Sequence, residues 1–158
     1  MEIRVRRAEV KDIPKMQDLL TQVCNVHSAG RPDIFKKDSQ KYTGQELELL
    51  IADETRPIFV GVDEEDRVVG YGFCVLIEYK DNNVIADRKE LYIDDLCVDE
   101  SARRSGVGGI LFEHIKAYAK EIGCYHVTLN VWACNESAMR FYESRGMKML
   151  KKEMEFIL

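Results

Sequence analysis

Three apolar runs near the middle of the chain restrict its fold more than any other feature. Ile58–Val62 and Val68–Leu76 are rich in β-branched and aromatic residues, and the short polar stretch Asp63–Asp66 lies between them. This pattern predicts an antiparallel hairpin. A third β-rich run, Glu90–Val98, follows a loop signal at Asp81–Asn83. We therefore expect an antiparallel sheet at the centre of the molecule.

Helical patterns precede this region. Apolar residues recur at helical spacing from Ile13 to Val23, Asp12 and Pro14 form a start signal, and the pattern fades towards Gly30. A shorter helix is expected around Leu47–Ile51. The remaining segments are assigned in chain order as a strand at Ile3–Arg7, a helix at Val107–Ile122, a strand at Val127–Trp132, a helix at Asn135–Arg145 and a last strand at Met147–Leu158.

The order of these elements predicts an α+β fold with a mixed sheet, in which an antiparallel meander comes first and a β-α-β crossover later. A length of 158 residues fits one domain that spans residues 1–158. We expect a cytoplasmic protein with no membrane partner, because the apolar runs are short and the charged amino terminus lacks an apolar signal segment.

Composition excludes several classes of function. The five cysteines are odd in number and have no C-x-x-C spacing, so we expect neither a disulfide framework nor a structural zinc site. A net charge of -5 disfavours broad binding to nucleic acid and suits positively charged partners such as amines. We therefore expect no metal and no nucleic-acid partner.

A glycine turn joins the third β-rich run to the helix that follows it. Arg103, Gly106 and Gly108 match Q/R-x-x-G-x-G/A at the start of an amphipathic helix. Glycines let the backbone approach a bulky anion, and the first helical turn offers unpaired N–H groups and a positive dipole end. The turn therefore favours a pyrophosphate group. The segment is neither a Walker A loop nor a Rossmann fingerprint, which disfavours ATP and NAD.

A second motif follows the strand after this helix. Asn135, Ala138 and Tyr142 match N-x-x-A-x-x-x-Y, and Arg145 and Gly146 close the segment. With both motifs present, the chain resembles the GNAT superfamily of N-acetyltransferases. The resemblance implies a mostly antiparallel sheet of six to seven strands, splayed at the coenzyme site and flanked by about four helices.

The resemblance also implies acetyl-coenzyme A as the acetyl donor. In such enzymes the pantetheine arm lies between the splayed strands. The residues that the resemblance places against the coenzyme are Leu96, Cys97, Val98, Arg103, Arg104, Ser105, Gly106, Val107, Gly108, Gly109, Asn130, Asn135, Ala138 and Tyr142.

Acetyl transfer to an amine needs an oxyanion donor, an acid for the leaving thiol and a means of neutralising the ammonium group. The Leu96 N–H is the candidate oxyanion donor, and Tyr142 is the candidate acid. Asp94 is the preferred base, acting through water, and cation binding is its rival role. Strand alternation places Asp94 on one face with Leu96 and Val98 and directs Asp95 to the other face, unless a bulge intervenes.

Acceptor contacts are expected from His27, Arg31, Glu78 and Asp95. The carboxylates favour a cationic amine, whereas Arg31 would equally bind a carboxylate on an amino acid or peptide. The sequence thus predicts transfer to a primary amine, on a small molecule or polyamine or on a polypeptide, by direct attack through a tetrahedral intermediate. A non-catalytic acyl-coenzyme A sensor on the same fold is the alternative. The resemblance favours a homodimer.

Overall fold

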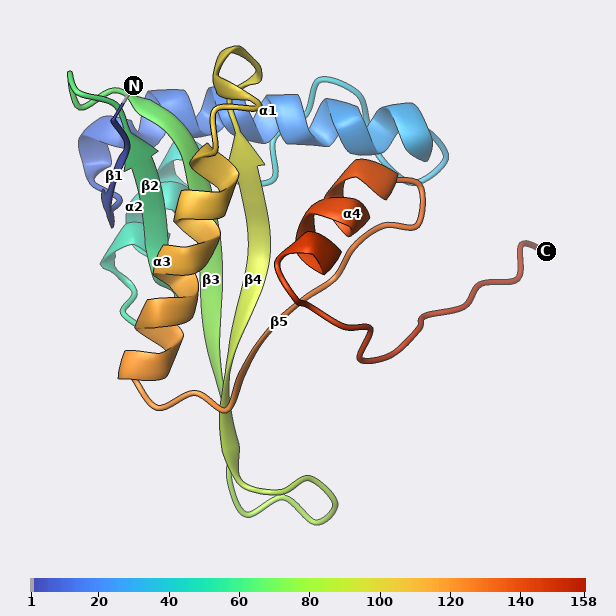
Figure 1. The fold of residues 1–158 in the computed structure, drawn as a ribbon. Coiled ribbons are helices and arrows are strands. Elements are labelled where there is room, and N and C mark those ends of the chain that lie inside the picture. The colour runs from blue at the N-terminus through green and yellow to red at the C-terminus, as the bar shows by residue number, and fades with distance from the viewer. Residues whose placement is uncertain (1) are drawn as a thin grey trace.

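The computed structural model describes residues 2–158, and these residues form one mixed sheet with helices on both of its faces (Figure 1). The sheet has five strands in the order β1-β2-β3-β4-β5. Neighbouring strands are antiparallel from β1 to β4, and β4 pairs with β5 in parallel. The expected α+β class, with an antiparallel meander followed by a crossover, is confirmed.

The strands take up the predicted β-rich runs and extend some of them. Their bounds are β1 Arg4–Arg7, β2 Ile58–Val62, β3 Val68–Tyr79, β4 Arg88–Val98 and β5 His126–Leu129. The β3–β4 hairpin extends beyond the body of the molecule (Figure 1). The last residues assigned to the fifth strand, Asn130–Trp132, lie in the loop that follows β5.

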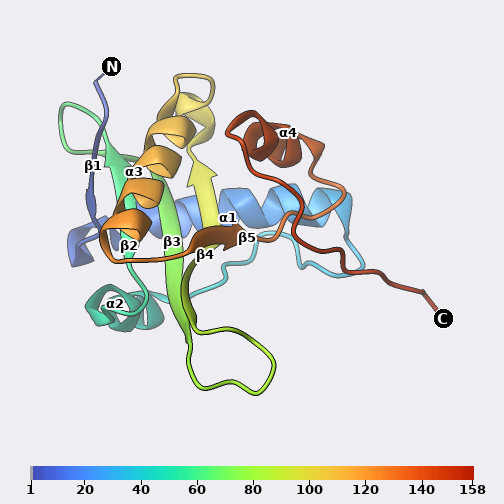
Figure 2. The same ribbon diagram turned by 60° about the horizontal axis from the view of Figure 1, so that its bottom comes forward.

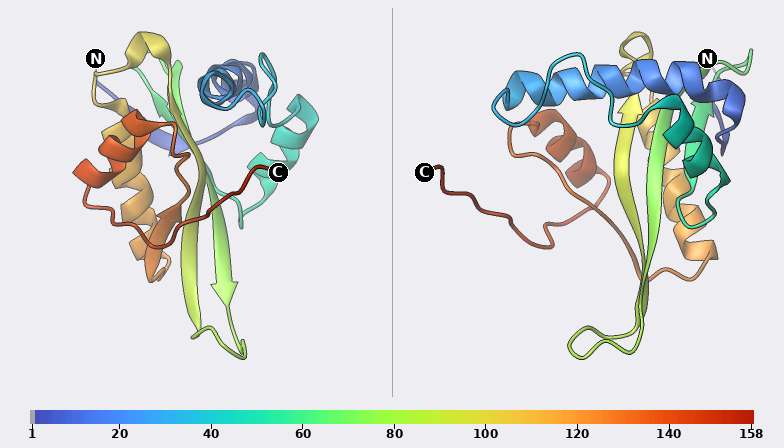
Figure 3. Two further views of the ribbon diagram at one scale, coloured as in Figure 1. Left: turned by 90° about the vertical axis from the view of Figure 1, so that its right-hand side faces the viewer. Right: turned by 180° about the vertical axis from the view of Figure 1, so that it is seen from behind.

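Four α-helices cover the sheet in the described part of the chain, two on each face (Figure 3). Helices α1 (Ile13–Gly30) and α2 (Gly44–Ala52) lie on one face, and α3 (Val107–Glu121) and α4 (Glu136–Ser144) lie on the other. Short 3-10 helices at Val10–Asp12 and Glu100–Ala102 precede α1 and the glycine turn. Within residues 2–158, no helix has the length and apolar character needed to cross a membrane.

Each face of the sheet has its own apolar core. On the α1 face, the fully buried Met16 and Leu19 pack with strand residues such as Val60 and Tyr71. On the other face, α3 supplies the buried residues and α4 adds half-buried aromatic side chains. The sheet is therefore held from both sides, and its strand ends are left to form a site.

The last segment differs from its prediction. Residues 147–158 form no strand and leave the body as an extended tail, so the described sheet has five strands instead of six to seven (Figure 2). The apolar side chains of this tail include Met154, which is 84% exposed, and Phe156, which is 87% exposed. An alternating pattern forms a strand only where another strand accepts its hydrogen bonds, and the tail pairs with no strand of the described chain.

Candidate active site

Strands β4 and β5 border the site, and their pairing stops halfway along β4. Strand β5 pairs with β4 only from Glu90 to Ile93, whereas β4 continues to Val98. From Asp94 onward, the edge of β4 that faces β5 has no strand partner among the described residues. This opening confirms the splay that the family resemblance implied, and it leaves backbone donors at Leu96 and Val98 for a ligand.

The glycine turn lies at the end of the splayed strand. Arg104 and Gly106 both adopt left-handed backbone conformations, with φ of 66° and 87°. Gly106 caps α3, and its carbonyl accepts the Ile110 N–H at 3.1 Å. Arg103 and Arg104 are exposed, and the hydroxyl of Ser105 donates to the Ala102 carbonyl. The turn thus directs the first N–H groups of α3 outward beside two cationic side chains.

Two further glycines bring α3 close to its neighbours. A Cβ at Gly108 would lie 3.4 Å from Phe141 Cζ on α4 and 3.5 Å from Val98 Cγ2 on β4. A Cβ at Gly109 would overlap the Arg145 guanidinium group. Strand β4 and helix α4 therefore both lie against the first turn of α3, where a larger side chain would close the space. Val107 is buried in the core, so only its backbone faces the turn.

Asn135 has a structural task that the motif does not reveal. Its side chain caps α4 by accepting the Ala138 N–H at 3.2 Å. Asn135 and the half-buried Ala138 therefore fix where α4 begins. The cap positions Tyr142 two turns further along the helix.

Tyr142 lies in an apolar setting that keeps it protonated. Its ring centroid is 6.0 Å from that of Phe112 and 5.1 Å from that of Phe141. Burial raises the pKa of the Tyr142 phenol, and the charges of Asp95 and Cys97 raise it further. The hydroxyl makes no hydrogen bond to the described chain, so it is available to donate to a ligand.

A bulge in β4 changes the direction of Asp94. Phe73 pairs with Asp95 and Cys74 pairs with Ile93, so Asp94 has no partner on β3. The expected face for Asp94 is therefore wrong. Leu96 packs against the α3 core, whereas Asp94 contacts residues on the α1 and α2 face. The extra residue of the bulge shifts the alternation, so Asp94 and Asp95 both point to that face.

Two residues from the loop before α2 hold the Asp94 carboxylate. The Lys41 ammonium lies 2.7 Å from Asp94 Oδ2, and the Tyr42 hydroxyl donates to the same oxygen at 3.0 Å. The Tyr42 ring stacks on Phe73 at 5.7 Å, and burial raises its pKa to about 12. Asp94 is therefore partnered by a cation, an arrangement that fits a carboxylate that binds an ammonium group.

Asp95 forms a separate buried pair with Tyr71, which is fully buried and donates to its carboxylate at 2.8 Å. Burial raises the pKa of the Asp95 carboxyl to about 6, and the Tyr71 hydrogen bond opposes that rise. A carboxyl group with this pKa can take up and release a proton near neutral pH, which suits a general base better than an ordinary aspartate does.

Three aromatic rings cluster at the end of α1. The His27 ring lies 5.1 Å from Phe35 and 6.4 Å from Trp132, and Phe35 meets Trp132 edge to face at 4.8 Å. Burial lowers the pKa of His27, and the charge of Lys41 lowers it further. His27 is therefore a neutral ring in an aromatic cluster that joins α1 to the loop after β5.

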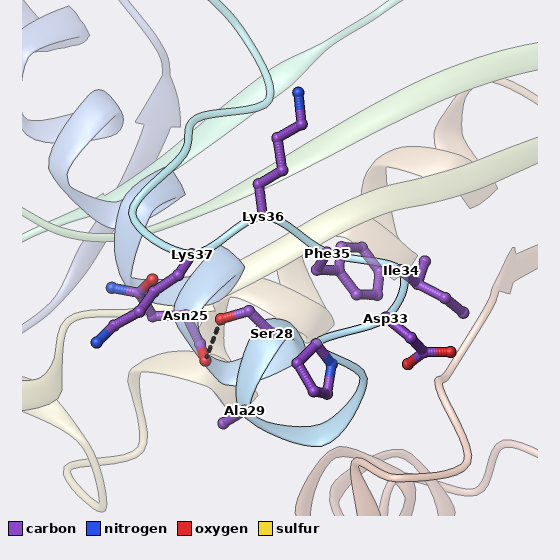
Figure 4. A pocket seen from close by; sticks show the side chains of 9 residues that line it. Asn25, Ser28, Ala29, Asp33, Ile34, Phe35, Lys36 and Lys37 are labelled. Atoms are coloured by element: carbon purple, nitrogen blue, oxygen red, sulfur yellow. Dashed lines mark hydrogen bonds between the residues drawn. The ribbon is translucent and has the colours of Figure 1, made fainter.

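A pocket of about 640 Å³ lies outside this cluster, between the end of α1 and the loop that follows it (Figure 4). Phe35 contributes to both the pocket and the cluster. The pocket lining is Asn25, Ser28, Ala29, Pro32, Asp33, Ile34, Phe35, Lys36 and Lys37. None of the residues predicted to act in catalysis lines it.

Two of the predicted acceptor contacts have other surroundings. Arg31 binds Asp33 at 2.8 Å and Glu155 of the tail at 2.5 Å, so its guanidinium already has two carboxylate partners. Glu78 pairs across the hairpin with Lys89, five residues beyond Phe73, which corresponds to roughly 16 Å along the strand. The structure therefore does not bring Glu78 together with Asp94 and Asp95, because β3 extends it away from the opening.

Asn130 and Cys97, both predicted to contact the coenzyme, have partners within the chain. The Asn130 amide donates to the Tyr92 hydroxyl at 3.2 Å. Cys97 is buried on the α1 side, where its thiol lies 3.6 Å from the Leu19 carbonyl, and burial raises its pKa to about 12. Its thiol is therefore a packing group and not a nucleophile.

Sequence reasoning missed several residues on the acceptor side. Lys41 and Tyr42 hold Asp94, and Tyr71 holds Asp95. One local signal could have indicated the first two, because Thr43 and Glu46 form a capping box that fixes the start of α2 directly after Tyr42. No local signal indicates the partner of Tyr71, since the register of β3 against β4 sets it.

Comparisons with known proteins agree with this geometry. The family described as "Acetyltransferase (GNAT) family" matches residues 20–147. The chain belongs to the GNAT acetyltransferase family. A mutant of the BH1408 protein from Bacillus halodurans has a solved structure that superposes with a TM-score of 0.93 and 33% identity, covering 98% of this chain and 99% of that chain.

Two curated relatives from this family have named activities. A probable glucosamine 6-phosphate N-acetyltransferase of Drosophila melanogaster is 26% identical over 81% of this chain and 52% of its own length. The peptidyl-lysine N-acetyltransferase YjaB of Escherichia coli K12 is 32% identical over 59% of this chain and 50% of its own length. The chain thus spans about half the length of the curated relatives it matches.

Proposed function

We propose that this protein transfers an acetyl group from acetyl-coenzyme A to a primary amine. The observation that carries the proposal is the splayed end of β4 with the glycine turn directly after it. Free backbone donors, an outward helix start and two exposed arginines meet there, and this donor set fits a pantetheine arm that ends in a pyrophosphate. Family membership supports the same donor.

Two groups would perform the chemistry, and a third set would hold the coenzyme. The Leu96 N–H would stabilise negative charge on the carbonyl oxygen under attack. Tyr142 would give a proton to the departing thiolate, because its raised pKa keeps the phenol protonated and its hydroxyl has no competing partner in the described chain. The backbone and side-chain groups of Arg103–Gly109 would hold the phosphates without taking part in the reaction.

The two aspartates would divide the work on the amine. Asp94, which pairs with the Lys41 ammonium group, would bind the substrate amine in its charged form. Asp95 would take the proton, directly or through water, because burial raises its pKa to about 6. This division revises the preference for Asp94 as the base, and the bulge that brings both carboxylates to one face is the reason.

The acceptor would be a primary amine whose body contacts aromatic rings. Asp94 supplies negative charge, and Phe35 and Trp132 supply an apolar wall. Small amines, polyamines and lysine side chains all meet the charge requirement. The relatives named above act on an amino sugar phosphate and on peptidyl-lysine by their names.

A homodimer in the cytoplasm is the expected setting. The exposed apolar tail, residues 147–158, supports the dimer, since a second copy could bury side chains such as Phe156 that the single chain leaves in solvent. Light scattering of the full chain and of a chain ending at residue 146 tests this. If the full chain and the truncated chain both have the molar mass of a single copy, the dimer is refuted.

An amine panel tests the proposed activity. Free thiol release from acetyl-coenzyme A should rise with at least one primary amine among polyamines, amino acids, aminoglycosides and peptides. Calorimetry with acetyl-coenzyme A runs in parallel. Binding without turnover for every amine would favour the alternative, a non-catalytic acyl-coenzyme A sensor, and absence of binding would refute both.

A further inference from the structure

Lys41 places a primary ammonium group in the candidate acceptor site. Its Nζ lies 2.7 Å from Asp94 Oδ2, and its side chain is 48% exposed while that of Asp94 is 18% exposed. An alkylammonium on a flexible four-carbon stem is chemically the acceptor of a lysine acetyltransferase. The chain therefore presents to its own site a group of the class that the site is proposed to modify.

Two anchored residues follow Lys41 directly in the chain. Its neighbour Tyr42 stacks on Phe73 with an interplanar angle of 25° and donates to Asp94 at 3.0 Å. On the other side of Tyr42, Thr43 caps α2 by accepting the Glu46 N–H at 3.2 Å. The Lys41 backbone thus precedes two anchored residues, and its ammonium is held at Asp94 by geometry as well as by charge.

Asp94 is also the first residue of the opened part of β4. Pairing with β5 ends at Ile93, and the candidate oxyanion donor Leu96 lies two residues beyond Asp94. The Lys41 ammonium therefore borders the segment where the thioester would be presented. A nucleophile held beside its electrophile reacts as if it were at very high concentration.

We propose that Lys41 is a site of self-acetylation, modified within its own chain. The inference rests on the proposed acetyltransferase activity. The Lys41 ammonium loses one proton to a carboxylate of the site, and its nitrogen forms a bond to the acetyl carbonyl carbon. The carbon–sulfur bond breaks, and Tyr142 gives a proton to the leaving sulfur and regains one from solvent. The nitrogen releases its second proton, so the products are an amide, a free thiol and one proton.

Acetylation would alter the site that performs it. The amide has no charge, so the ion pair between Lys41 and Asp94 would be lost. Asp94 would then be free to bind the ammonium group of an external amine. The modified chain would differ from the unmodified chain in acceptor affinity, while the coenzyme turn at Arg103–Gly108 is unaffected.

Lys116 is a matched control for the chemistry of an exposed lysine. Its Nζ lies 3.0 Å from Glu113 Oε2 and its side chain is 45% exposed, which closely resembles Lys41 in exposure and pairing. It lies in the second half of α3, beyond the residues at the start of that helix that are proposed to hold the phosphates. Reaction of acetyl-coenzyme A with lysines in solution would label both residues to a similar extent.

The test is a time course of the full chain with acetyl-coenzyme A, followed by peptide mapping with mass spectrometry. Lys41 should be acetylated at least about tenfold faster than Lys116, because only Lys41 is held at the site. The first-order rate constant should not change with protein concentration, and an excess of desulfo-coenzyme A should suppress labelling at Lys41 alone. The Lys41→Arg variant should bind acetyl-coenzyme A normally and carry no acetyl group at that position.

The inference is overturned if Lys41 and Lys116 are acetylated at equal rates. It is also overturned if desulfo-coenzyme A does not suppress acetylation of Lys41. A rate constant that rises in proportion to protein concentration would overturn transfer within one chain. If external amines are acetylated and Lys41 is not, this inference fails and the proposed function stands. If acetyl-coenzyme A does not bind at all, the proposed function itself fails.

Discussion

The coenzyme side and the acceptor side of this site are built in different ways. The coenzyme side comes mainly from one continuous stretch, the end of β4, the glycine turn and the start of α3. The acceptor side combines α1, the loop before α2, the bulge in β4, the loop after β5 and the tail. The first is local in sequence and the second is not.

The difference explains why one side can be identified from spacing and the other cannot. A phosphate requires several N–H groups from consecutive residues, so the requirement is written as a short motif. An acceptor amine requires one or two carboxylates and an apolar wall, and residues far apart in the chain can supply these. Coenzyme binding and acceptor binding should therefore respond to different substitutions.

The largest effect is expected where three elements converge on Gly108. Gly108→Trp would place an indole between β4 and α4, where a Cβ alone already lies 3.4 Å from Phe141 Cζ. Acetyl-coenzyme A affinity should fall by more than about 100-fold, measured by calorimetry. Gly108→Ala should keep most of the affinity. Circular dichroism of both variants checks that they fold, and normal affinity in a folded Gly108→Trp chain would contradict the coenzyme site.

Tyr142→Phe removes the candidate acid and leaves the packing of the ring. Turnover should fall by about 10² to 10⁴, the range typical of acid catalysis, with an unchanged coenzyme dissociation constant. Steady-state kinetics and calorimetry separate these two effects. Tyr118→Phe on α3 is the matched control, and its turnover should equal that of the natural chain. Unchanged turnover in Tyr142→Phe would remove this residue from its role.

Asp95→Asn should change how stability depends on pH. The pKa of Asp95 is about 6 in the folded chain against an ordinary value of 3.8. Because the folded state disfavours the charged form, this group costs stability progressively as pH rises from about 4 to 6, on the order of 2 to 3 kcal/mol in total. Asparagine has no charge and avoids this cost.

Urea unfolding of both chains at several pH values measures the difference. The natural chain should lose stability relative to Asp95→Asn between pH 4 and 6, and the difference should be constant above that window. A stability difference that does not vary with pH would mean that Asp95 ionises normally. The Tyr71 hydroxyl can still donate to the asparagine oxygen, so the hydrogen bond is not the variable under test.

Asp94→Asn should act on the acceptor side alone. Loss of the charge should raise the Michaelis constant for a cationic amine by about tenfold, the effect of losing one charge-assisted hydrogen bond. The dissociation constant of acetyl-coenzyme A should not change. A weaker coenzyme complex in this variant would show that the two sides are not separable.

The smallest effect is expected at the tail. Glu155→Gln breaks its ion pair with Arg31, which keeps Asp33 as a partner. Exposed ion pairs contribute little to stability, so the melting temperature should stay within experimental error. If the Michaelis constant for a carboxylate-bearing amine falls, Arg31 is an acceptor contact that the tail competes for, and an unchanged constant would remove Arg31 from the site.

Individual residues show which parts of the fold and the site the sequence could predict. The hairpin, the long helices and the glycine turn follow from periodicity and turn chemistry, and all are present. The face of Asp94 was wrong because one extra residue in β4 shifts every side chain after it. The prediction of a strand at residues 147–158 was wrong because an alternating sequence pattern does not supply a strand to pair with.

Local sequence patterns predicted the elements as far as α4, their order and the coenzyme motif, because each depends on residues within a few turns of one another. Packing between distant segments decided which carboxylates meet, through strand register, and which loop lies against them. It also decided that Lys41 lies on Asp94, 53 residues away along the chain. Contacts between distant segments depend on packing of the whole sheet, and no local pattern encodes them.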